Sequence, residues 1–98
     1  MGADTFQTVA SGTTAAEAFR SAQEAAVYEH GHGGYTGTIC EKQGFVKIAD
    51  RPMTLEAAST LADKLFDDAD PRIDDKWGPA GCIPLENGDY YFFGWASS

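Results

Sequence analysis

The chain has 98 residues, of which 43% are hydrophobic and 12% aromatic, so we expect one domain with its own core and exclude a disordered chain. Fifteen acidic against seven basic residues give a net charge of −8, which disfavours direct binding to nucleic acid. No apolar run approaches the ~20 residues of a membrane span, and the start of the chain lacks the pattern of a signal peptide. We therefore predict a cytoplasmic protein that has no contact with a membrane.

The first third of the chain predicts a strand and a helix. Residues 5–10 favour a strand that stops at Ser11-Gly12. Thr14 and Glu17 have the spacing of a capping box, which marks the start of a helix that ends before Gly31. Its apolar residues recur at helical spacing: Ala15, Ala18, Phe19, Ala22 and Ala26.

The middle of the chain is predicted to be extended and then helical. Strand-prone residues in the range 35–49 are interrupted near Gln43-Gly44. This pattern indicates either a hairpin turning at Gln43-Gly44, which we favour, or one long strand with a bulge. Thr54 is a good N-cap for a second helix. The apolar residues of that helix are Leu55, Ala58, Leu61, Ala62, Leu65 and Phe66.

The last third of the chain predicts an irregular acidic loop over residues 67–79, followed by a hairpin over residues 82–95 that turns at Asn87-Gly88. The resulting order, β-α-β-β-α-β plus a C-terminal strand, is that of a ferredoxin-like fold with one addition. We predict a single α+β domain spanning residues 1–98. In it, two helices pack on one face of a mainly antiparallel sheet of four to five strands.

A loop rich in glycine and histidine is the first candidate site. We predict that His30, His32, Gly33, Gly34 and Tyr35 contribute to binding, because the glycines allow close approach of the backbone to another molecule. Their spacing matches neither the P-loop nor the dinucleotide fingerprint, so no cofactor is predicted. Binding of a small ligand or nucleotide by this loop is an alternative hypothesis for the function.

Metal binding and catalysis have few candidate residues. His30 and His32 with Cys40 or Cys82 offer zinc ligands, but the two cysteines lie far apart in sequence, so no metal is predicted. Cys40 paired with His30 or His32 is the only candidate for nucleophilic catalysis in the sequence, and no catalytic residue is predicted. We expect both cysteines to be small buried side chains rather than a disulfide.

The second candidate site surrounds Trp77. Asp74, Asp75 and Trp77 are predicted binding residues, since an aromatic side chain ringed by charge is typical of a binding hot spot. The alternative is that Trp77 closes one end of the core. The tail also places aromatics on both faces of one strand (Tyr90, Tyr91, Phe92, Phe93, Trp95). One face can enter the core, and a second copy of the chain in a homodimer is a candidate to cover the other.

Two blocks of sequence carry a resemblance to a known family. They are residues 28–39, YEHGHGGYTGTI, and residues 70–81, DPRIDDKWGPAG. Both resemble a family of small uncharacterised proteins of phages that infect mycobacteria and related actinobacteria. The resemblance runs from about the first strand to the tryptophan loop. It implies the cytoplasm of an infected bacterium as the setting and carries over no functional residue.

The leading hypothesis is therefore a non-enzymatic, phage-encoded accessory protein that binds a host protein. The predicted contact surface joins the glycine-histidine loop, the acidic loop with Trp77 and exposed tail aromatics. A third hypothesis is an acidic mimic of nucleic acid, because six aspartates fall within residues 63–75.

Overall fold

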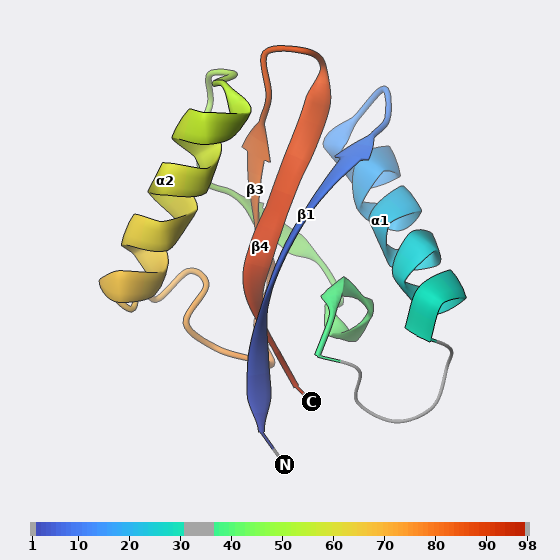
Figure 1. Cartoon of the computed structure of the whole chain (residues 1–98), viewed down its shortest axis with the longest axis vertical. Coiled ribbons are helices and arrows are strands. Elements are labelled where there is room, and N and C mark those ends of the chain that lie inside the picture. Colours follow the sequence, from blue (N-terminus) through green and yellow to red (C-terminus); the bar gives the residue numbers. More distant parts are fainter. Residues whose placement is uncertain (1, 31–36, 98) are drawn as a thin grey trace.

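The structure is a computed structural model that describes residues 2–30 and 37–97. Its elements are β1 (Ala3–Ser11), α1 (Ala15–His30), the 3-10 turn η1 (Ile39–Glu41), β2 (Phe45–Lys47), α2 (Leu55–Asp67), β3 (Ala80–Pro84) and β4 (Asp89–Ser97). The strands form one mixed sheet in the order β1-β4-β3-β2, in which only β2 and β3 are parallel (Figure 1). The fold is α+β with the order β-α-β-α-β-β.

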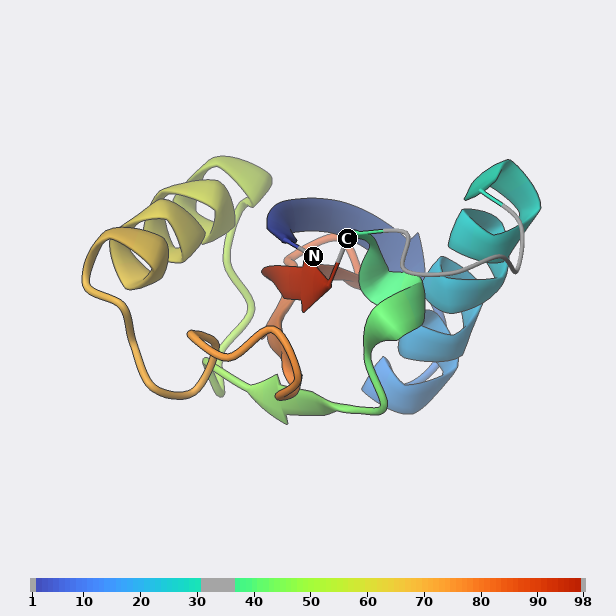
Figure 2. The same ribbon diagram turned by 90° about the horizontal axis from the view of Figure 1, so that it is seen from below.

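The two helices cover opposite faces of the sheet, and the prediction that they share one face is wrong. Phe92 packs in a cluster with Ala18 and Phe19 of α1, whereas Tyr91 and Phe93 pack with residues of α2. Figure 2 shows the two helices on either side of the strands. The reason is that β4 carries large aromatics on both faces, and each face must be covered. Helix α2 of the same chain therefore covers the second aromatic face of β4, for which a second copy of the protein was the candidate.

Both helices begin at their predicted caps. The Thr14 hydroxyl accepts a hydrogen bond from the Glu17 amide at 3.2 Å, and the Glu17 carboxylate accepts one from the Thr13 hydroxyl at 2.8 Å. The Thr54 hydroxyl accepts from the Ala57 amide at 3.1 Å. The bonds from the Glu17 and Ala57 amides satisfy N–H groups that the first turn of a helix leaves without a partner. The predicted apolar stripes face the sheet, with the exception of Leu55 at the start of α2, which is 54% exposed.

The predicted C-terminal hairpin is confirmed. β3 and β4 pair antiparallel, and the Gly88 amide donates to the Leu85 carbonyl at 3.0 Å to close the turn. Gly88 has a φ of +93°, which a glycine adopts without steric cost. Gly81 of β3 is required for a different reason, because a Cβ there would lie 2.6 Å from the ring of Phe93. The backbone of β3 at Gly81 therefore packs directly against the Phe93 ring of β4.

The segment before α2 contradicts both predictions for residues 35–49, of which 35 and 36 lie outside the described residues. In place of a hairpin or a long bulged strand, it forms the η1 turn and a three-residue strand, β2, that runs parallel to β3. The Thr38 hydroxyl accepts from the Cys40 amide at 3.3 Å and starts η1. The Gln23 side-chain amide of α1 donates to the carbonyls of Ile39 at 3.3 Å and Lys42 at 2.6 Å. These contacts use backbone groups that a strand would have paired, so tertiary hydrogen bonds override β propensity here.

The order of elements also departs from a ferredoxin-like fold. The parallel strands β2 and β3 are connected through α2, which makes a β-α-β unit, and the antiparallel β3–β4 hairpin closes the chain. The sheet has four strands, and β4 occupies a central position between β1 and β3. This places α1 and α2 on opposite sides and leaves β1 at one edge.

Candidate functional site

The structure brings Asp75 and Trp77 together in one tight turn, which we call the Trp77 loop (residues 75–78). The Asp75 carboxylate accepts from the Trp77 amide at 2.9 Å, and the Gly78 amide donates to the Asp75 carbonyl at 2.9 Å. The Trp77 side chain is 60% exposed, so it does not close the core. The Nζ of Lys76 lies 5.2 Å from the centre of the Trp77 ring, within the range of a cation–π contact.

A buried lysine holds the Trp77 loop in place. Lys42 is 3% exposed, and its Nζ donates to the carbonyls of Asp75 at 3.3 Å, Lys76 at 3.3 Å and Gly78 at 3.0 Å. An ammonium group has three N–H donors, so these three carbonyls satisfy it completely. The Trp77 loop is thereby tied to the turn that follows α1.

Burial of the charged Lys42 ammonium costs free energy, and its hydrogen bonds to the three loop carbonyls offset that cost. Burial lowers the pKa of Lys42, and the nearby negative charge of Asp75 acts in the opposite direction. The Lys42 carbonyl also accepts the Gln23 side-chain amide of α1. A lysine among strand-prone residues gave no sign of this role in the sequence, because its three partners lie 33 to 36 residues further along the chain.

Three of the six clustered aspartates are used for local structure: Asp75 in the Trp77 loop, and Asp68 and Asp70. The Arg72 guanidinium donates to both carboxylate oxygens of Asp70 at 3.0 Å and holds the pKa of Asp70 below its usual value. Lys64 and Asp68 form an ion pair of 2.6 Å along α2, which raises the pKa of Lys64. These two ion pairs neutralise Asp68 and Asp70, whereas the phosphates of a nucleic-acid backbone form an unbroken row of negative charge. The mimicry hypothesis stays a prediction.

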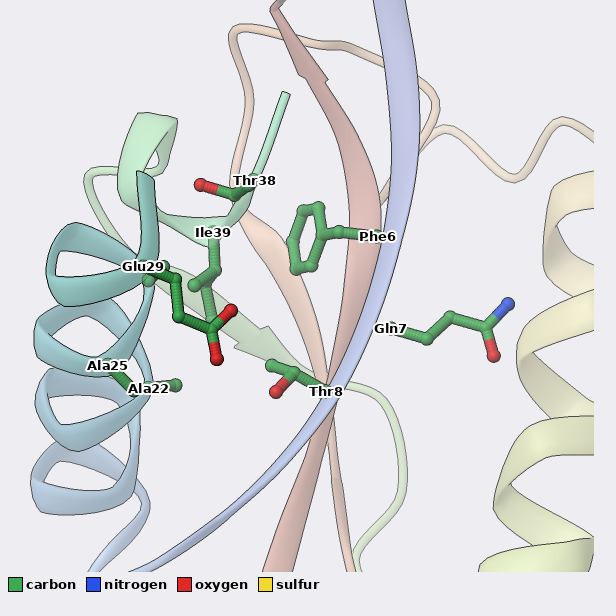
Figure 3. Close-up of a pocket in the computed structure, with 9 residues that line it drawn as sticks. Phe6, Gln7, Thr8, Ala22, Ala25, Glu29, Thr38 and Ile39 are labelled. Carbon is green, nitrogen blue, oxygen red and sulfur yellow. The ribbon is translucent and has the colours of Figure 1, made fainter. Parts of the chain in front are cut away.

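A pocket of about 220 Å³ lies between α1 and β1 (Figure 3). Its apolar lining residues come from α1, β1 and η1: Phe6, Ala22, Ala25, Ala26 and Ile39. Polar and charged residues line the rest: Gln7, Thr8, Glu29 and Thr38. The Glu29 carboxylate points into it, toward the side on which Thr8 lies. A carboxylate beside apolar side chains favours a ligand with an aliphatic stem and a cationic end, and it disfavours the phosphates of a nucleotide.

The glycine-histidine loop was the other predicted site. His32, Gly33, Gly34 and Tyr35 lie outside the described residues, and His30 is the last residue of α1. Asp74 lies in the segment that precedes the Trp77 loop and is exposed. The predicted surface that joins His30 to Trp77 therefore stays a prediction. The tail aromatics expected in that surface are mainly in the core, since Tyr91, Phe92 and Phe93 are buried.

Both cysteines are free thiols; Cys82 is buried as predicted, whereas the prediction that Cys40 is also buried is wrong. Cys82 is buried in β3, and burial raises its pKa to about 11. Cys40 is half-buried and its thiol donates to the Gln23 carbonyl at 3.3 Å. A thiol with a raised pKa is mostly protonated at neutral pH, so Cys82 is a weak nucleophile.

Across residues 2–30 and 37–97, no three side chains of His, Cys, Asp or Glu are grouped closely enough to hold a metal ion. Neither α1 nor α2, as far as they are described, combines the length and apolarity that crossing a bilayer demands. Comparison with known proteins finds no matching family model, curated protein or solved structure.

Proposed function

We propose that this chain is a non-catalytic binding protein that grips a partner protein through the Trp77 loop. The observation that carries the proposal is that Trp77 is exposed to solvent on a loop whose backbone carbonyls are held by the buried Lys42. Exposed large aromatics on a rigid support are typical of hot spots in protein interfaces.

The binding free energy that Trp77 can contribute depends on how ordered the Trp77 loop is before binding. Burying an indole in a partner's pocket removes apolar area from water, but a mobile loop loses part of that gain when it becomes ordered. Here the Asp75 carboxylate and the Lys42 ammonium already hold the backbone on both sides of Trp77. Most of the ordering has therefore occurred during folding, and the contact retains more of its binding free energy.

The hollow next to Trp77 extends the surface. It has a volume of about 340 Å³ and is lined by Gln43, Gly44, Trp77, Gly78 and Pro79. Gln43 and Gly44 directly follow Lys42 in the chain, so the lysine positions both sides of the hollow. A projecting side chain of the partner would occupy it while Trp77 enters the partner.

The sequence resemblance suggests who the partner is. A phage-encoded accessory protein with no catalytic role acts by binding a protein of its bacterial host, in the host cytoplasm. The net charge of −8 favours a partner with a basic surface.

The test is capture of the partner from a lysate of the host with wild-type chain and with Trp77→Ala. We expect one stoichiometric partner for the wild type and a loss of about 2 kcal/mol or more in binding free energy for the variant. Tyr28→Ala is the matched control, since Tyr28 is an aromatic of α1 that is 92% exposed and lies outside the Trp77 loop. A complex that survives Trp77→Ala unchanged refutes the proposed surface.

A second variant tests the support rather than the contact. Lys42→Met keeps most of the stem of the side chain and leaves three carbonyls without their donor. We expect a loss of about 1–3 kcal/mol in the free energy of unfolding and weaker capture although Trp77 is intact. Unchanged capture by a folded Lys42→Met would show that the order of the loop does not matter for binding.

A further inference from the structure

The outer edge of β1 is the longest strand edge that lacks a neighbour in the sheet of the described residues. β1 pairs with β4 along its whole length, from Ala3↔Ser97 to Ser11↔Asp89, and no other strand within residues 2–30 and 37–97 lies beside its outer edge. The residues of β1 are exposed or half-buried, and Val9 is 42% exposed. The edge therefore offers backbone groups for pairing over nine residues.

The direction of these backbone groups follows from the hydrogen bonds of β3. The Ala80 amide donates to the Gly44 carbonyl and the Cys82 carbonyl accepts from Ile48, so even-numbered residues of β3 face the β2 side. Odd-numbered residues of β3 then direct their backbone groups toward β4. Because the register pairs odd-numbered residues of β3 with odd-numbered residues of β4, the odd-numbered residues of β4 face β3. Even-numbered residues of β4 must face β1. In β1, the odd-numbered residues therefore direct their N–H and C=O groups outward (Ala3, Thr5, Gln7, Val9 and Ser11).

This edge lacks the usual protection against pairing. Natural edge strands are blunted by lysines, prolines, bulges or inward-pointing charges. Residues 3–11 contain no lysine, arginine or proline, and Asp4 is their only charged residue. The strand is also rich in residues that favour extended structure, including Thr5, Phe6, Thr8 and Val9.

The pocket that contains Glu29 reaches this same edge. Phe6 and Thr8 point into the pocket, whereas the Gln7 side chain points away from it (Figure 3). The Gln7 side chain is held on the opposite face by the Tyr91 hydroxyl, which donates to it. Because Gln7 still lines the pocket, its backbone must form that part of the wall. The outward-facing backbone of Gln7 and the pocket are therefore adjacent.

We propose that β1 accepts an extended segment of a partner protein as a fifth strand, and that this segment inserts a lysine or arginine side chain into the pocket. Strand addition is an established mode of peptide recognition, in which backbone hydrogen bonds give affinity and pockets for alternate side chains give specificity. The aliphatic stem packs against Phe6 and Ala26, and the cationic end reaches the Glu29 carboxylate. The inference rests on the proposed function in that the ligand belongs to a protein.

A second copy of the chain fits this edge less well than a partner does. Residues 3–11 hold no lysine or arginine, so a paired β1 of another copy would bring no cation to Glu29. Each chain also carries a net charge of −8, and two copies repel each other over the whole surface. A basic segment is attracted by the same charge.

The experiment selects binders to the whole chain from a library of random peptides that match the nine residues of β1 in length. We expect the selected peptides to alternate β-branched residues with a lysine or arginine. Replacement of that basic residue by leucine should weaken binding about tenfold. Failure to select any peptide, or selection of peptides that lack a basic residue, overturns the proposal.

Matched variants locate the binding. Thr5→Pro removes an outward N–H without removing a hydrogen bond to β4, so the fold should persist while peptide binding falls about tenfold; Thr5→Ala keeps the N–H and the affinity. Glu29→Gln should weaken the basic peptide about fivefold and leave the leucine peptide unchanged. Glu24→Gln, a substitution of an exposed glutamate on α1 that does not line the pocket, should change neither. Peptide binding that neither Thr5→Pro nor Glu29→Gln weakens refutes the assignment. A stable dimer of the chain that dissociates on Thr5→Pro also refutes it.

The two proposals fail separately. Trp77→Ala should leave peptide binding intact, because Trp77 does not line the pocket. If peptides bind at β1 while capture of the partner ignores Trp77→Ala, the proposed Trp77 surface is wrong and the edge assignment stands. If Trp77→Ala abolishes capture and no peptide binds at β1, the converse holds.

Discussion

The two faces of the sheet are packed with different chemistry. On the α2 face, large side chains of strand, loop and helix interlock, and Ile73, Ile83 and Phe93 are almost completely buried. On the α1 face, the helix contributes mostly alanine, and the aromatic cluster of Phe19, Phe45 and Phe92 occupies only part of the space.

The difference explains where the pocket lies. An alanine stripe lets α1 approach the sheet, but methyl groups cannot fill the space beside β1 beyond the aromatic cluster. The same side of the molecule carries the polar junction of Gln23 and Lys42, which fixes the Trp77 loop. The α2 face buries more of the large apolar side chains, and the α1 side holds the features to which we assign binding.

The largest expected effect is on the α2 face. Phe93→Ala removes a ring in contact with Phe66 and Tyr91, and we expect a loss of about 3–5 kcal/mol in the free energy of unfolding. Phe6→Ala, on the half-buried wall of the pocket, should cost about 1–2 kcal/mol. Urea unfolding of both variants measures the difference, and equal losses would show that the two faces are packed alike.

Replacing an alanine by a larger residue on each face also tests the difference in packing. Ala62→Leu adds atoms to a site with no exposed surface and should destabilise the protein by about 1–3 kcal/mol. Ala26→Leu extends into the pocket and should change stability by less than about 1 kcal/mol. The melting temperatures of the two variants give the comparison, and an Ala26→Leu variant as unstable as the Ala62→Leu variant would mean that the pocket has no room.

The buried thiol on the α1 face predicts a fall in stability at alkaline pH. The folded-state pKa of Cys82 is about 11, above its ordinary value of 9.0, so the unfolded state loses the proton first as the pH rises. Stability is unaffected below pH 9 and falls between the two values, by about 1 kcal/mol at pH 10. The difference between wild type and Cys82→Ala in urea unfolding at pH 8 and pH 10 isolates this effect, because Lys42 and Tyr91 titrate in both proteins. A constant difference would contradict the assignment.

The smallest expected effect is at the end of α2. Ala69 has a φ of +50°, and the Asp70 amide donates to the Leu65 carbonyl at 3.0 Å, which is the hydrogen bond of a Schellman cap. Glycine adopts this conformation without the steric cost that a Cβ brings. Ala69→Gly should therefore stabilise the protein by about 0.5–1 kcal/mol, whereas Asp68→Gly, at a residue with ordinary helical φ, should destabilise it. Calorimetry of the two variants checks the sign.

Several elements were predictable because their signals are local. Thr14 and Thr54 cap the helices, Asn87-Gly88 turns the hairpin, and the apolar stripes of both helices face the core. The aromatics on both faces of the last strand also indicated that both faces need cover. The error was to look for that cover outside the chain, since α2 provides it.

The candidate site was predictable only in part. Trp77 was identified from its flanking charges, and the structure leaves it exposed. Lys42 and the pocket at Glu29 were missed, since neither shows a pattern in the local sequence.

The sequence by itself determined the helices, the hairpin and the identity of the apolar residues, because caps, turns and periodicity act over a few residues. The tertiary structure alone decided that α1 and α2 lie on opposite faces, that residues 39–47 form a turn and a short parallel strand, and that β1 is left at an edge. These outcomes depend on hydrogen bonds between segments far apart in the chain, such as those of Gln23 with Ile39 and of Lys42 with Gly78. Their free energy exceeds the local preference for an extended strand, and no local pattern records it.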